Sequence, residues 1–421
     1  MIVEQQGHSK NPPSERNRTA DHGSAAGDGG NAVWHIIVGE YPPDIGGVSD
    51  YTFLLAGALA MQGDEVHVWC PESSGEAPPM QRVTVHRELG KVSPADLRRV
   101  GKELDRFPDP HRILVQWVPH GFRYRSMNLP FCWWLRNRAA RRGDRVDIML
   151  HEPYLEFRVN SIRQSAAAFV HRLMTIVLLR AAERVWMSIP GWEPRWRPYA
   201  LGRKIPFQWL PIPSGIPVRS DPAGVSAIRR RYLQDHRCLI GHFGTFGWPI
   251  TSVLEPILLS LCREPDRQTM LFIGVGSQEF RQALIEKDAS LERCIQATGP
   301  LAAEDISLHL TACDLMIQPY PDGVSTRRTS FMAPLSHGKP IVTTSGPLTE
   351  DCWQNGGVVP LAKAGDTAEF VKLVRGLRDD PEERERLARA ARELYCERFE
   401  VDRIVAALRG SVPLSKGQQA V

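Results

Sequence analysis

The segment that begins at Pro319 carries the densest group of side chains suited to binding an anion. It reads PYPDGVSTRR and includes an acid, two hydroxyl residues and two arginines among its members: Asp322, Gly323, Val324, Ser325, Thr326, Arg327 and Arg328. Guanidinium groups make bidentate contacts with phosphate oxygens, and a short hydroxyl side chain caps a helix or binds phosphate. A solvated turn with a surface arginine pair explains the same residues, so the sequence leaves both interpretations open.

Loops that contain glycine offer backbone N–H groups to a ligand at three further places. Gly46 and Gly47 precede a helical pattern, and the N-terminus of a helix favours an anion. A helix-entry turn that needs a positive φ is the alternative reason for this glycine pair. The loops GHFGTFG and GVGS each follow an apolar run and supply further candidates: His242, Gly244, Thr245 and Gly276.

Histidines at the ends of expected strands are the other candidates for contact with a ligand. His151 ends the run DIMLHEP, with Glu152 beside it, and His120 follows the run RILVQWV. Each histidine has an alternative role as a hydrogen-bonded structural residue, and the sequence does not separate the two roles.

Apolar runs that alternate with helical patterns must position these side chains. The run VWHIIVG (33–39), the helical pattern TFLLAGALAMQG (52–63) and the run EVHVWCP (65–71) form a strand–loop–helix–strand unit. Such a unit begins a doubly wound α/β domain with a parallel sheet. Further strands are expected in this half at 112–118, 147–153, 184–190 and 207–213.

A second α/β set follows the Pro- and Gly-rich stretch at 213–224, which we interpret as an interdomain linker. Strands of this second set are expected within 238–246, 269–277, 294–301, 314–325, 339–346 and 356–362. Ligands of open α/β sheets bind beyond the carboxyl ends of the strands. Two such domains facing one another therefore predict a site in the cleft between them.

The expected organisation has five parts. They are a disordered polar tail at 1–31, a Rossmann-like domain at 32–213, a second Rossmann-like domain at 214–395, a helix at 396–412 returning to the first domain, and a flexible tail at 413–421.

Composition excludes several classes of protein. The chain has 421 residues, 42% of them hydrophobic and 24% charged, and its net charge of +4 argues against a dedicated nucleic-acid binder. The eight cysteines form no CxxC pair and suit buried, reduced thiols of a cytosolic protein. The N-terminal stretch lacks the apolar core of a signal peptide, and no uninterrupted apolar run reaches the length of a transmembrane helix.

Positive charge is concentrated in residues 121–204. That section holds 15 Arg and 1 Lys against 2 Asp and 4 Glu, which gives a net charge of 16 − 6, or +10. Since the whole chain has a net charge of +4, the remaining residues carry 4 − 10, or −6. Aromatic residues lie among the arginines, as in FRYRSMNLPFCWWLRNRAARRGDR. An anionic membrane surface or an anionic acceptor would be attracted to such a section, and a solvated arginine-rich face is the alternative.

The familiar nucleotide and hydrolase motifs are absent from the sequence. The first turn has no GxGxxG, and the chain has no Walker P-loop, HExxH or GxSxG. What is present is EYPPDIGGVSDYTFLLAGALAMQGDEVHVWCP, followed later by LFIGVGSQEFRQAL, ATGPLAAEDISLHLTACDLMIQPYPDGVS and LSHGKPIVTTSG. In order and spacing, residues 33–410 resemble the bacterial family-4 glycosyltransferases, which have the GT-B fold of two facing Rossmann-like domains.

The resemblance implies a retaining glycosyltransferase. It implies a nucleotide-diphosphate sugar of the UDP or GDP type as co-substrate, no metal and no cofactor, and a glycan or lipid-linked acceptor. Synthesis of surface polysaccharide or glycolipid, a cytoplasmic location and contact with the inner face of the membrane are family expectations.

The candidate site residues fall into three groups by their expected role. Catalytic roles fall on His151, Asp322, Arg327 and Arg328. The acceptor side includes His120 and Glu152. Donor binding falls on Gly46, Gly47, His242, Gly244, Thr245, Gly276, Gly323, Val324, Ser325 and Thr326.

This chain departs from the family pattern at two places. The family usually has an arginine and a lysine after the first strand of the second domain, where this chain has GHFGTFGWPI. The family's two glutamates, eight apart, fall either on Ser325 and Ala333 or on Asp322 and Ser330, so the second glutamate is missing either way.

The two arginines of the 319–328 loop offer a replacement for the missing positive charge. Arg327 and Arg328 can bind the diphosphate, and Asp322 can accept hydrogen bonds from sugar hydroxyls. Pro334 disfavours a helix that begins far ahead of it. A degenerate GT-B protein that binds a nucleotide sugar or glycan without transfer is the alternative, and an epimerase or phosphorylase of the same fold is less favoured because no lysine lies in a fitting motif.

Overall fold

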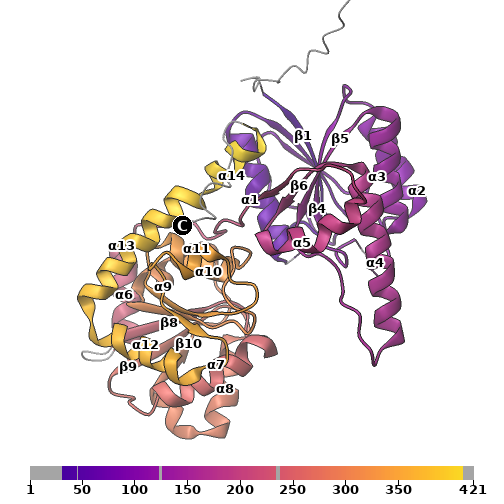
Figure 1. Ribbon diagram of the computed structural model, residues 1–421. Coiled ribbons are helices and arrows are strands. Elements are labelled where there is room, and N and C mark those ends of the chain that lie inside the picture. Colours follow the sequence, from indigo (N-terminus) through magenta and orange to yellow (C-terminus); the bar gives the residue numbers. More distant parts are fainter. Residues whose placement is uncertain (1–30, 45, 123–125, 234–237, 411–421) are drawn as a thin grey trace, which may run out of the picture. The chain divides into compact units, whose positions relative to one another are not determined.

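The computed structural model describes residues 31–44, 46–122, 126–233 and 238–410. Apart from Asn31, the tails expected at 1–31 and 413–421 lie outside the described residues. Two parallel sheets, each flanked by helices, account for the described chain (Figure 1).

The first sheet has seven strands in the order β3-β2-β1-β4-β5-β6-β7, and each strand is parallel to its neighbours. Chain order reverses between β1 and β4, so loops leaving those two strands diverge and open a crevice. Its strands are β1 (Val33–Ile37), β2 (Glu65–Trp69), β3 (Val83–His86), β4 (Arg112–Trp117), β5 (Arg145–Leu150), β6 (Ala182–Met187) and β7 (Phe207–Trp209).

Helices cover both faces of this sheet and bury two hydrophobic clusters against it. Helix α1 begins five residues before the apolar pattern that predicts it, because its first turn carries Ser49 and Asp50 in place of apolar residues. The helices are α1 (Gly47–Met61), α2 (Pro94–Leu104), α3 (Leu129–Arg142), α4 (Ile162–Ala181) and α5 (Glu193–Trp196), with 3-10 turns η2 (Pro190–Trp192) and η3 (Arg197–Ala200).

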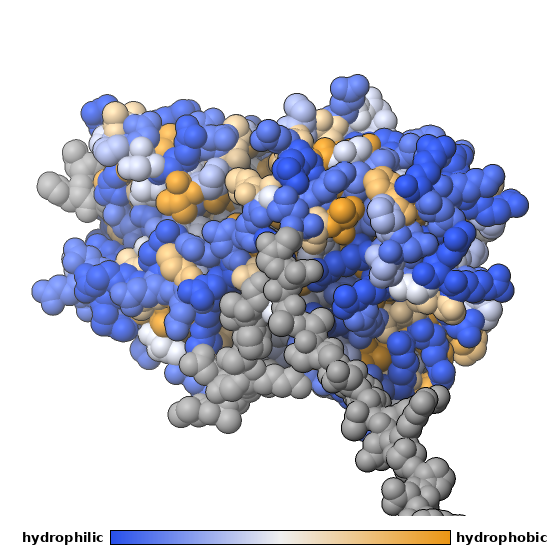
Figure 2. Space-filling model, turned by 90° about the horizontal axis from the view of Figure 1, so that it is seen from above, coloured by the Kyte–Doolittle hydropathy of each residue, from blue (hydrophilic) through white to orange (hydrophobic). Residues whose placement is uncertain are grey.

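Among the described residues, α4 alone is long and apolar enough to cross a membrane, judged by length and composition. Met174, Leu178 and Leu179 of α4 lie fully buried in the first hydrophobic cluster. We therefore interpret α4 as a helix of this domain. On the molecular face shown in Figure 2, hydrophilic residues predominate and hydrophobic ones form small separate groups.

The second sheet has six parallel strands in the order β10-β9-β8-β11-β12-β13. Chain order reverses between β8 and β11, again at the centre of the sheet. Its strands are β8 (Cys238–Phe243), β9 (Gln268–Ile273), β10 (Ile295–Ala297), β11 (Leu315–Gln318), β12 (Ile341–Ser345) and β13 (Leu361–Lys363).

The helices of the second half include one that begins inside the predicted linker, where Asp221 caps α6 through the N–H of Gly224. They are α6 (Pro222–Tyr232), α7 (Trp248–Leu261), α8 (Ser277–Lys287), α9 (Ala303–Ala312), α10 (Thr329–Ser336), α11 (Asp351–Gln354), α12 (Thr367–Asp379) and α13 (Pro381–Arg398), with the 3-10 turn η4 (Ala289–Arg293).

The last helix, α14 (Val401–Leu408), packs against α1 rather than on the second sheet (Figure 1). Ile404, Val405 and Leu408 are fully buried in the hydrophobic cluster that includes the apolar side of α1. The sequence predicts one helix over 396–412, but the chain leaves the helical conformation at Phe399 and Glu400, so α13 and α14 are separate.

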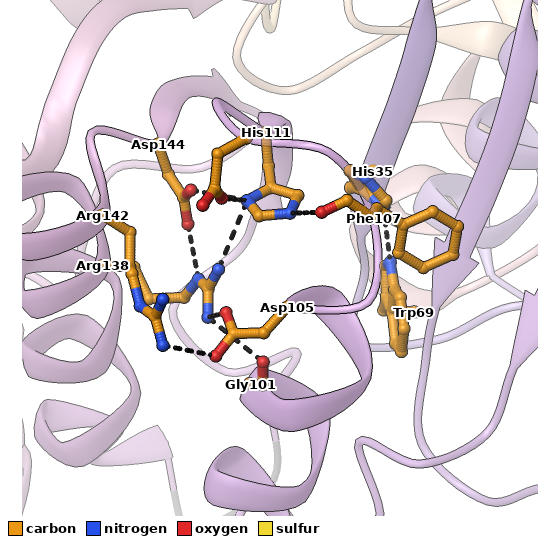
Figure 3. A network of polar contacts seen from close by, with 10 residues as sticks. His35, Trp69, Gly101, Asp105, Phe107, His111, Arg138, Arg142 and Asp144 are labelled. Atoms are coloured by element: carbon orange, nitrogen blue, oxygen red, sulfur yellow. Dashed lines mark hydrogen bonds and ion pairs between the residues drawn. The ribbon is translucent and has the colours of Figure 1, made fainter.

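A polar network near the start of β4 ties α2, α3 and β5 together (Figure 3). Arg138 donates from Nε to Asp144 at 2.5 Å and from a terminal nitrogen to Asp105 at 3.0 Å. The other oxygen of Asp144 lies 2.7 Å from Nδ1 of His111, and both of these side chains are buried. One buried guanidinium thus neutralises carboxylates from two separate segments.

Replacement of Arg138 by methionine is expected to lower the free energy of unfolding by about 3–5 kcal/mol, because it leaves buried Asp144 without its cation. Urea denaturation measures the loss. Arg142→Met is the matched control: Arg142 pairs with the same Asp105 at 2.8 Å but is half exposed, so less than about 1 kcal/mol is expected. Equal losses in the two variants would contradict the role given to Arg138.

Candidate functional site

A cavity of about 300 Å³ opens at the point where the order of the first sheet reverses. Loops after β1 and β4, the start of α1 and the end of β5 supply most of its wall, and Ile212, Arg327 and Thr329 complete it. Five residues predicted from the sequence meet there: Gly47, His120, His151, Glu152 and Arg327.

The N-terminus of α1 is already occupied by a carboxylate. Gly47 is the first helical residue, and Gly46 before it has φ −179°, so the positive φ considered for this pair is not needed. Ser49 donates its backbone N–H to Oε1 of Glu40 at 3.4 Å, and a Cβ added to Gly46 would lie 2.1 Å from the same oxygen. Glu40 therefore stands where the glycine pair predicts a bound anion.

Glu40 is a functional candidate that the sequence analysis missed. Burial raises the pKa of its carboxyl, and Asp50 and Asp44 act in the same direction. Its only sequence signal is an acid directly after a buried strand and its glycine.

His151 lies at the inner end of the cavity as an uncharged imidazole. Its Nε2 donates to Oε1 of Gln116 at 2.8 Å. The ring of Tyr51 meets it edge-on, with centroids 5.3 Å apart. Burial lowers the pKa of His151 to about 3, so the ring is neutral at physiological pH. Gln116 and Tyr51 were not predicted, because each lies within a pattern that reads as apolar core.

His120 and Glu152 lie at the cavity rim. Nδ1 of His120 is 3.8 Å from the Glu152 carboxylate, and the two side chains are 60% and 46% exposed. Both can therefore reach a large ligand that enters from solvent.

Asp322 is engaged by both arginines of its loop. Arg327 donates to Oδ2 at 2.9 Å, and Arg328 donates to Oδ1. Each oxygen of Asp322 thus already accepts from an arginine, and its predicted role as an acceptor for sugar hydroxyls stays a prediction. Arg327 faces the cavity, whereas Arg328 stacks over the ring of Tyr320, 4.7 Å from its centroid, and does not line the cavity.

Ser325 and Thr326 do not cap a helix, contrary to one of their predicted roles. Helix α10 starts at Thr329 with Arg328 at the N-cap, and both hydroxyl residues are fully buried. The hydroxyl of Thr326 contacts the carboxyl of Glu350 at 2.5 Å. Thr326 thus has structural contacts in the described conformation, and its predicted role in ligand binding stays a prediction.

Two more predicted residues of this loop are held inside the fold. A Cβ added to Gly323, whose φ is +86°, would lie 2.2 Å from Oγ1 of Thr349 and 2.4 Å from the nitrogen of Gly346. Val324 is fully buried. This part of the loop therefore packs on the loop after β12, and the predicted donor-binding role of these two residues stays a prediction.

The remaining donor-side candidates lie outside the cavity. His242 is buried, with Nδ1 2.9 Å from the carbonyl of Ile317, and its Nε2 has no hydrogen-bond partner among the described residues. Gly244 and Gly276 have positive φ, the latter as the N-cap of α8, and Thr245 is exposed. The structure brings none of these four to the cavity.

One cluster outside the cavity has the spacing of a metal site. Ligand atoms of Asp109, His111 and Asp144 lie within 4.8 Å of one another. The guanidinium of Arg138 contacts both Asp144 and His111 and supplies the positive charge that a cation would bring (Figure 3). We interpret this cluster as structural.

Family models match both halves of the chain. Residues 45–187 match the model described as Glycosyltransferase Family 4, and residues 294–410 match the model described as Glycosyl transferase-like. The chain therefore carries two glycosyltransferase family domains. No curated protein matches its sequence.

Solved structures show the same fold as this glycosyltransferase. Sucrose-phosphate synthase from Thermosynechococcus elongatus has a TM-score of 0.66 at 15% identity, over 90% of this chain and 97% of its own. HepE from Anabaena has a TM-score of 0.65 at 15% identity, over 90% and 99%. WaaG, a glycosyltransferase involved in lipopolysaccharide biosynthesis, has a TM-score of 0.63 at 13% identity, over 91% and 100%.

The loop that carries Arg327 is attached to the first half of this glycosyltransferase through Thr326. The Thr326 hydroxyl lies 2.8 Å from the carbonyl of Ser188 and 2.5 Å from Oε1 of Glu350, and it accepts from the indole of Trp209 at 3.2 Å. The carbonyl of Ser188 offers no proton, and a hydroxyl has one. Two short oxygen–oxygen contacts therefore need a second proton, which a neutral Glu350 supplies.

Glu350 is suited to carry that proton. Burial raises the pKa of its carboxyl to about 7, against smaller opposing effects that include the hydrogen bond from the backbone N–H of Thr326. The indole N–H of Trp353 donates to the other oxygen at 2.9 Å. The attachment of the loop is then strongest when this carboxyl is neutral.

Protection of residues 319–328 from hydrogen exchange is expected to fall about tenfold between pH 6 and pH 8. Because the pKa of Glu350 is raised, its carboxyl stabilises the attachment of this loop fully at acidic pH, and this stabilisation is lost as the pH rises through about 7. Exchange mass spectrometry, corrected for the intrinsic pH dependence of exchange, measures it.

Glu350→Gln is the control, because the amide keeps a donor and an acceptor but does not titrate. Its protection in this loop should be independent of pH over the same interval. The same pH profile in both proteins would contradict a role for the Glu350 proton.

Proposed function

We propose that this glycosyltransferase moves a sugar from a UDP- or GDP-type donor to a hydroxyl of a glycan or lipid-linked acceptor, with retention and without a metal ion. Arg327 carries the proposal, because it brings a half-buried guanidinium to a cavity whose inner residues are neutral and polar. Support comes also from HepE of Anabaena, whose structures are described as complexes with UDP, with UDP and glucose, and with UDP-glucose.

The leaving diphosphate gains negative charge in the transition state, and positioned donors stabilise it there. One terminal nitrogen of Arg327 binds Asp322, but its Nε is buried without a partner among the described residues. That N–H remains for a phosphate oxygen. In this proposal Arg327 replaces the arginine and lysine that GHFGTFGWPI lacks.

The proton of the attacking hydroxyl needs an acceptor. His151 is a weak base because burial lowers its pKa to about 3. We assign the proton to the departing phosphate, which lies on the same face of the sugar in a retaining reaction. His151 then orients the substrate.

A surface on α3, α4 and the segment before α4 supports the lipid-linked class of acceptor. Of fifteen exposed large hydrophobic residues among the described ones, eight lie in 127–173. They form what we call the α3–α4 surface: Met127, Trp133, Leu155, Phe157, Val159, Ile162, Phe169 and Leu173. Arginines of the strongly basic section are interleaved with them. We propose that this surface docks on the anionic cytoplasmic face of a membrane.

One observation favours the alternative, a protein that binds a nucleotide sugar without transferring it. Asp322 holds both arginines, and each oxygen of its carboxylate is engaged. Transfer requires Arg327 to share its charge between Asp322 and the diphosphate, whereas a binder needs no such rearrangement.

UDP-, GDP- and ADP-sugars, screened by thermal shift and by release of nucleoside diphosphate, test the proposed transfer. Stabilisation and slow hydrolysis are expected with a UDP- or GDP-sugar, and Arg327→Ala should reduce turnover at least tenfold, because one charged donor is lost.

Arg145→Ala is the matched control, since Arg145 is an exposed arginine paired with Glu183 at 2.8 Å, remote from the cavity lining. Its turnover should stay within twofold of the wild type. Binding without turnover in the wild type would favour the alternative function, and no binding by any nucleotide would contradict both.

Vesicle flotation tests the α3–α4 surface. The wild type should bind vesicles that contain anionic lipid more strongly than neutral ones, and added salt should weaken binding. The double variant Phe157→Ser and Ile162→Ser should lose most of this binding. Trp248→Ser, which removes another exposed aromatic residue outside the surface, should keep it. Equal flotation of all three proteins would contradict the proposal.

A further inference from the structure

The carboxylate of Glu40 occupies the start of α1 inside the cavity. Glu40 lines the cavity together with Gly47 and Val48 of the helix. Its Oε1 accepts the backbone N–H of Ser49 at 3.4 Å, and the backbone N–H of Val48 donates to the same carboxylate. N–H groups in the first turn of a helix have no partner within the helix, and they favour an anion. A side chain of the protein itself thus fills the place that this helix offers to an anionic ligand.

The glycine pair before α1 fits this carboxylate on one side and leaves open space on the other. A Cβ added to Gly46 would lie 2.1 Å from Oε1 and 2.7 Å from Oε2 of Glu40. A Cβ added to Gly47 would meet no atom within 4 Å. The turn therefore touches Glu40 at Gly46 and faces the open cavity at Gly47, from which side a ligand can approach the helix.

The backbone around Glu40 is fixed, so its side chain is the part that can move. A Cβ added to Gly39 would lie 2.2 Å from the carbonyl oxygen of Gly121, which shows that the loops after β1 and β4 touch there. Further along the first of these loops, the carbonyl of Asp44 accepts the hydroxyl of Ser49 at 2.7 Å. Rotation about the side-chain bonds of Glu40 can withdraw its carboxylate from α1 without moving either loop.

The carboxylate is weakly held where it lies. Its contact with the N–H of Ser49 is long for an N–H···O hydrogen bond. Burial raises the pKa of Glu40, and the neighbouring carboxylates of Asp50 and Asp44 act in the same direction. The N–H groups of the helix therefore do not fully offset the cost of burying this negative charge. An anion that also contacts Arg327, in the wall of the same cavity, is better placed to use those N–H groups.

We propose that Glu40 is an internal competitor of the donor, holding the start of α1 until the diphosphate displaces its carboxylate. The inference rests on the proposed function, because the diphosphate belongs to the donor named there. Two anions on the N–H groups of one helical turn repel each other strongly. The Glu40 side chain therefore turns away as the diphosphate binds between Arg327 and Gly47. In the empty enzyme the same side chain keeps small anions out of the site.

Binding of UDP-glucose at pH 8, measured by calorimetry, tests the competition. Glu40→Gln should bind at least about fivefold tighter than the wild type, because a neutral amide competes less for the N–H groups of α1. Glu40→Asp should bind at least about twofold tighter, because it keeps the charge but is too short for a contact that is already long. Tighter binding is the informative result, since damage to the site would weaken binding.

Asp50→Asn is the matched control. Asp50 carries a carboxylate in the same first turn of α1, but it is exposed and does not line the cavity. Loss of this screened charge should change the affinity for UDP-glucose by less than about twofold. An equal gain in Asp50→Asn and Glu40→Gln, or a gain in Glu40→Gln that Glu40→Asp does not share, would assign the effect to net charge and overturn the inference. Weaker binding by both Glu40 variants would also overturn it, because Glu40 would then hold the donor.

Sulfate tests the start of α1 without a nucleotide. In Glu40→Gln, sulfate should shift the backbone amide signals of Val48 and Ser49 in nitrogen-15 NMR spectra, with chloride at equal ionic strength as the reference. In the wild type these signals should move far less. Failure of UDP-glucose to bind any of these proteins would refute UDP as the nucleotide of the donor, while the sulfate arm still decides the role of Glu40. Equal sulfate shifts in the wild type and Glu40→Gln would overturn the inference.

Discussion

The hydroxyl of Thr326 holds the site together. It contacts the carbonyl of Ser188 just after β6, the carboxyl of Glu350 beyond β12 and the indole of Trp209 on β7. The backbone of Thr326 adds a bond, since its carbonyl accepts the N–H of Ile212 at 3.0 Å. Arg327, the next residue, reaches the cavity only because Thr326 is held in this way. A small change to the Thr326 side chain therefore affects the position of Arg327 more than the loss of a nearby surface charge does.

The architecture was predictable because parallel strands buried on both faces read as apolar runs. The strands from β1 to β12 that border the site fall within or next to the expected runs. The short strand β3 and helix α2 did not stand out, because Val83–His86 is only half buried and α2 carries its apolar residues on one narrow side. The element order predicted two α/β domains, and the family resemblance implied their GT-B organisation, which the solved structures share.

The site was predicted less well, for a physical reason. Ser325 and Thr326 look like phosphate ligands in a loop, and their burial depends on Glu350, which lies 24 residues later in the chain. Gln116 and Tyr51 sit among apolar neighbours, so a sequence pattern counts them as interior positions. Glu40 carries no motif at all. Spacing shows which residues share an element, but not which polar atoms find a partner across elements.

The contact of α14 with α1 gives the chain an interleaved order. The hydrophobic cluster between these two helices includes Leu55 and Leu59 from near the beginning of the chain and Ile404 and Leu408 from near its end. In chain order, the strands of the second sheet thus lie between α1 and α14, which pack against each other. On the ribosome, the second half can fold when its own strands have emerged, whereas the part of α1 that packs on α14 stays uncovered until translation is almost complete. A chaperone can cover this part of α1 during that interval.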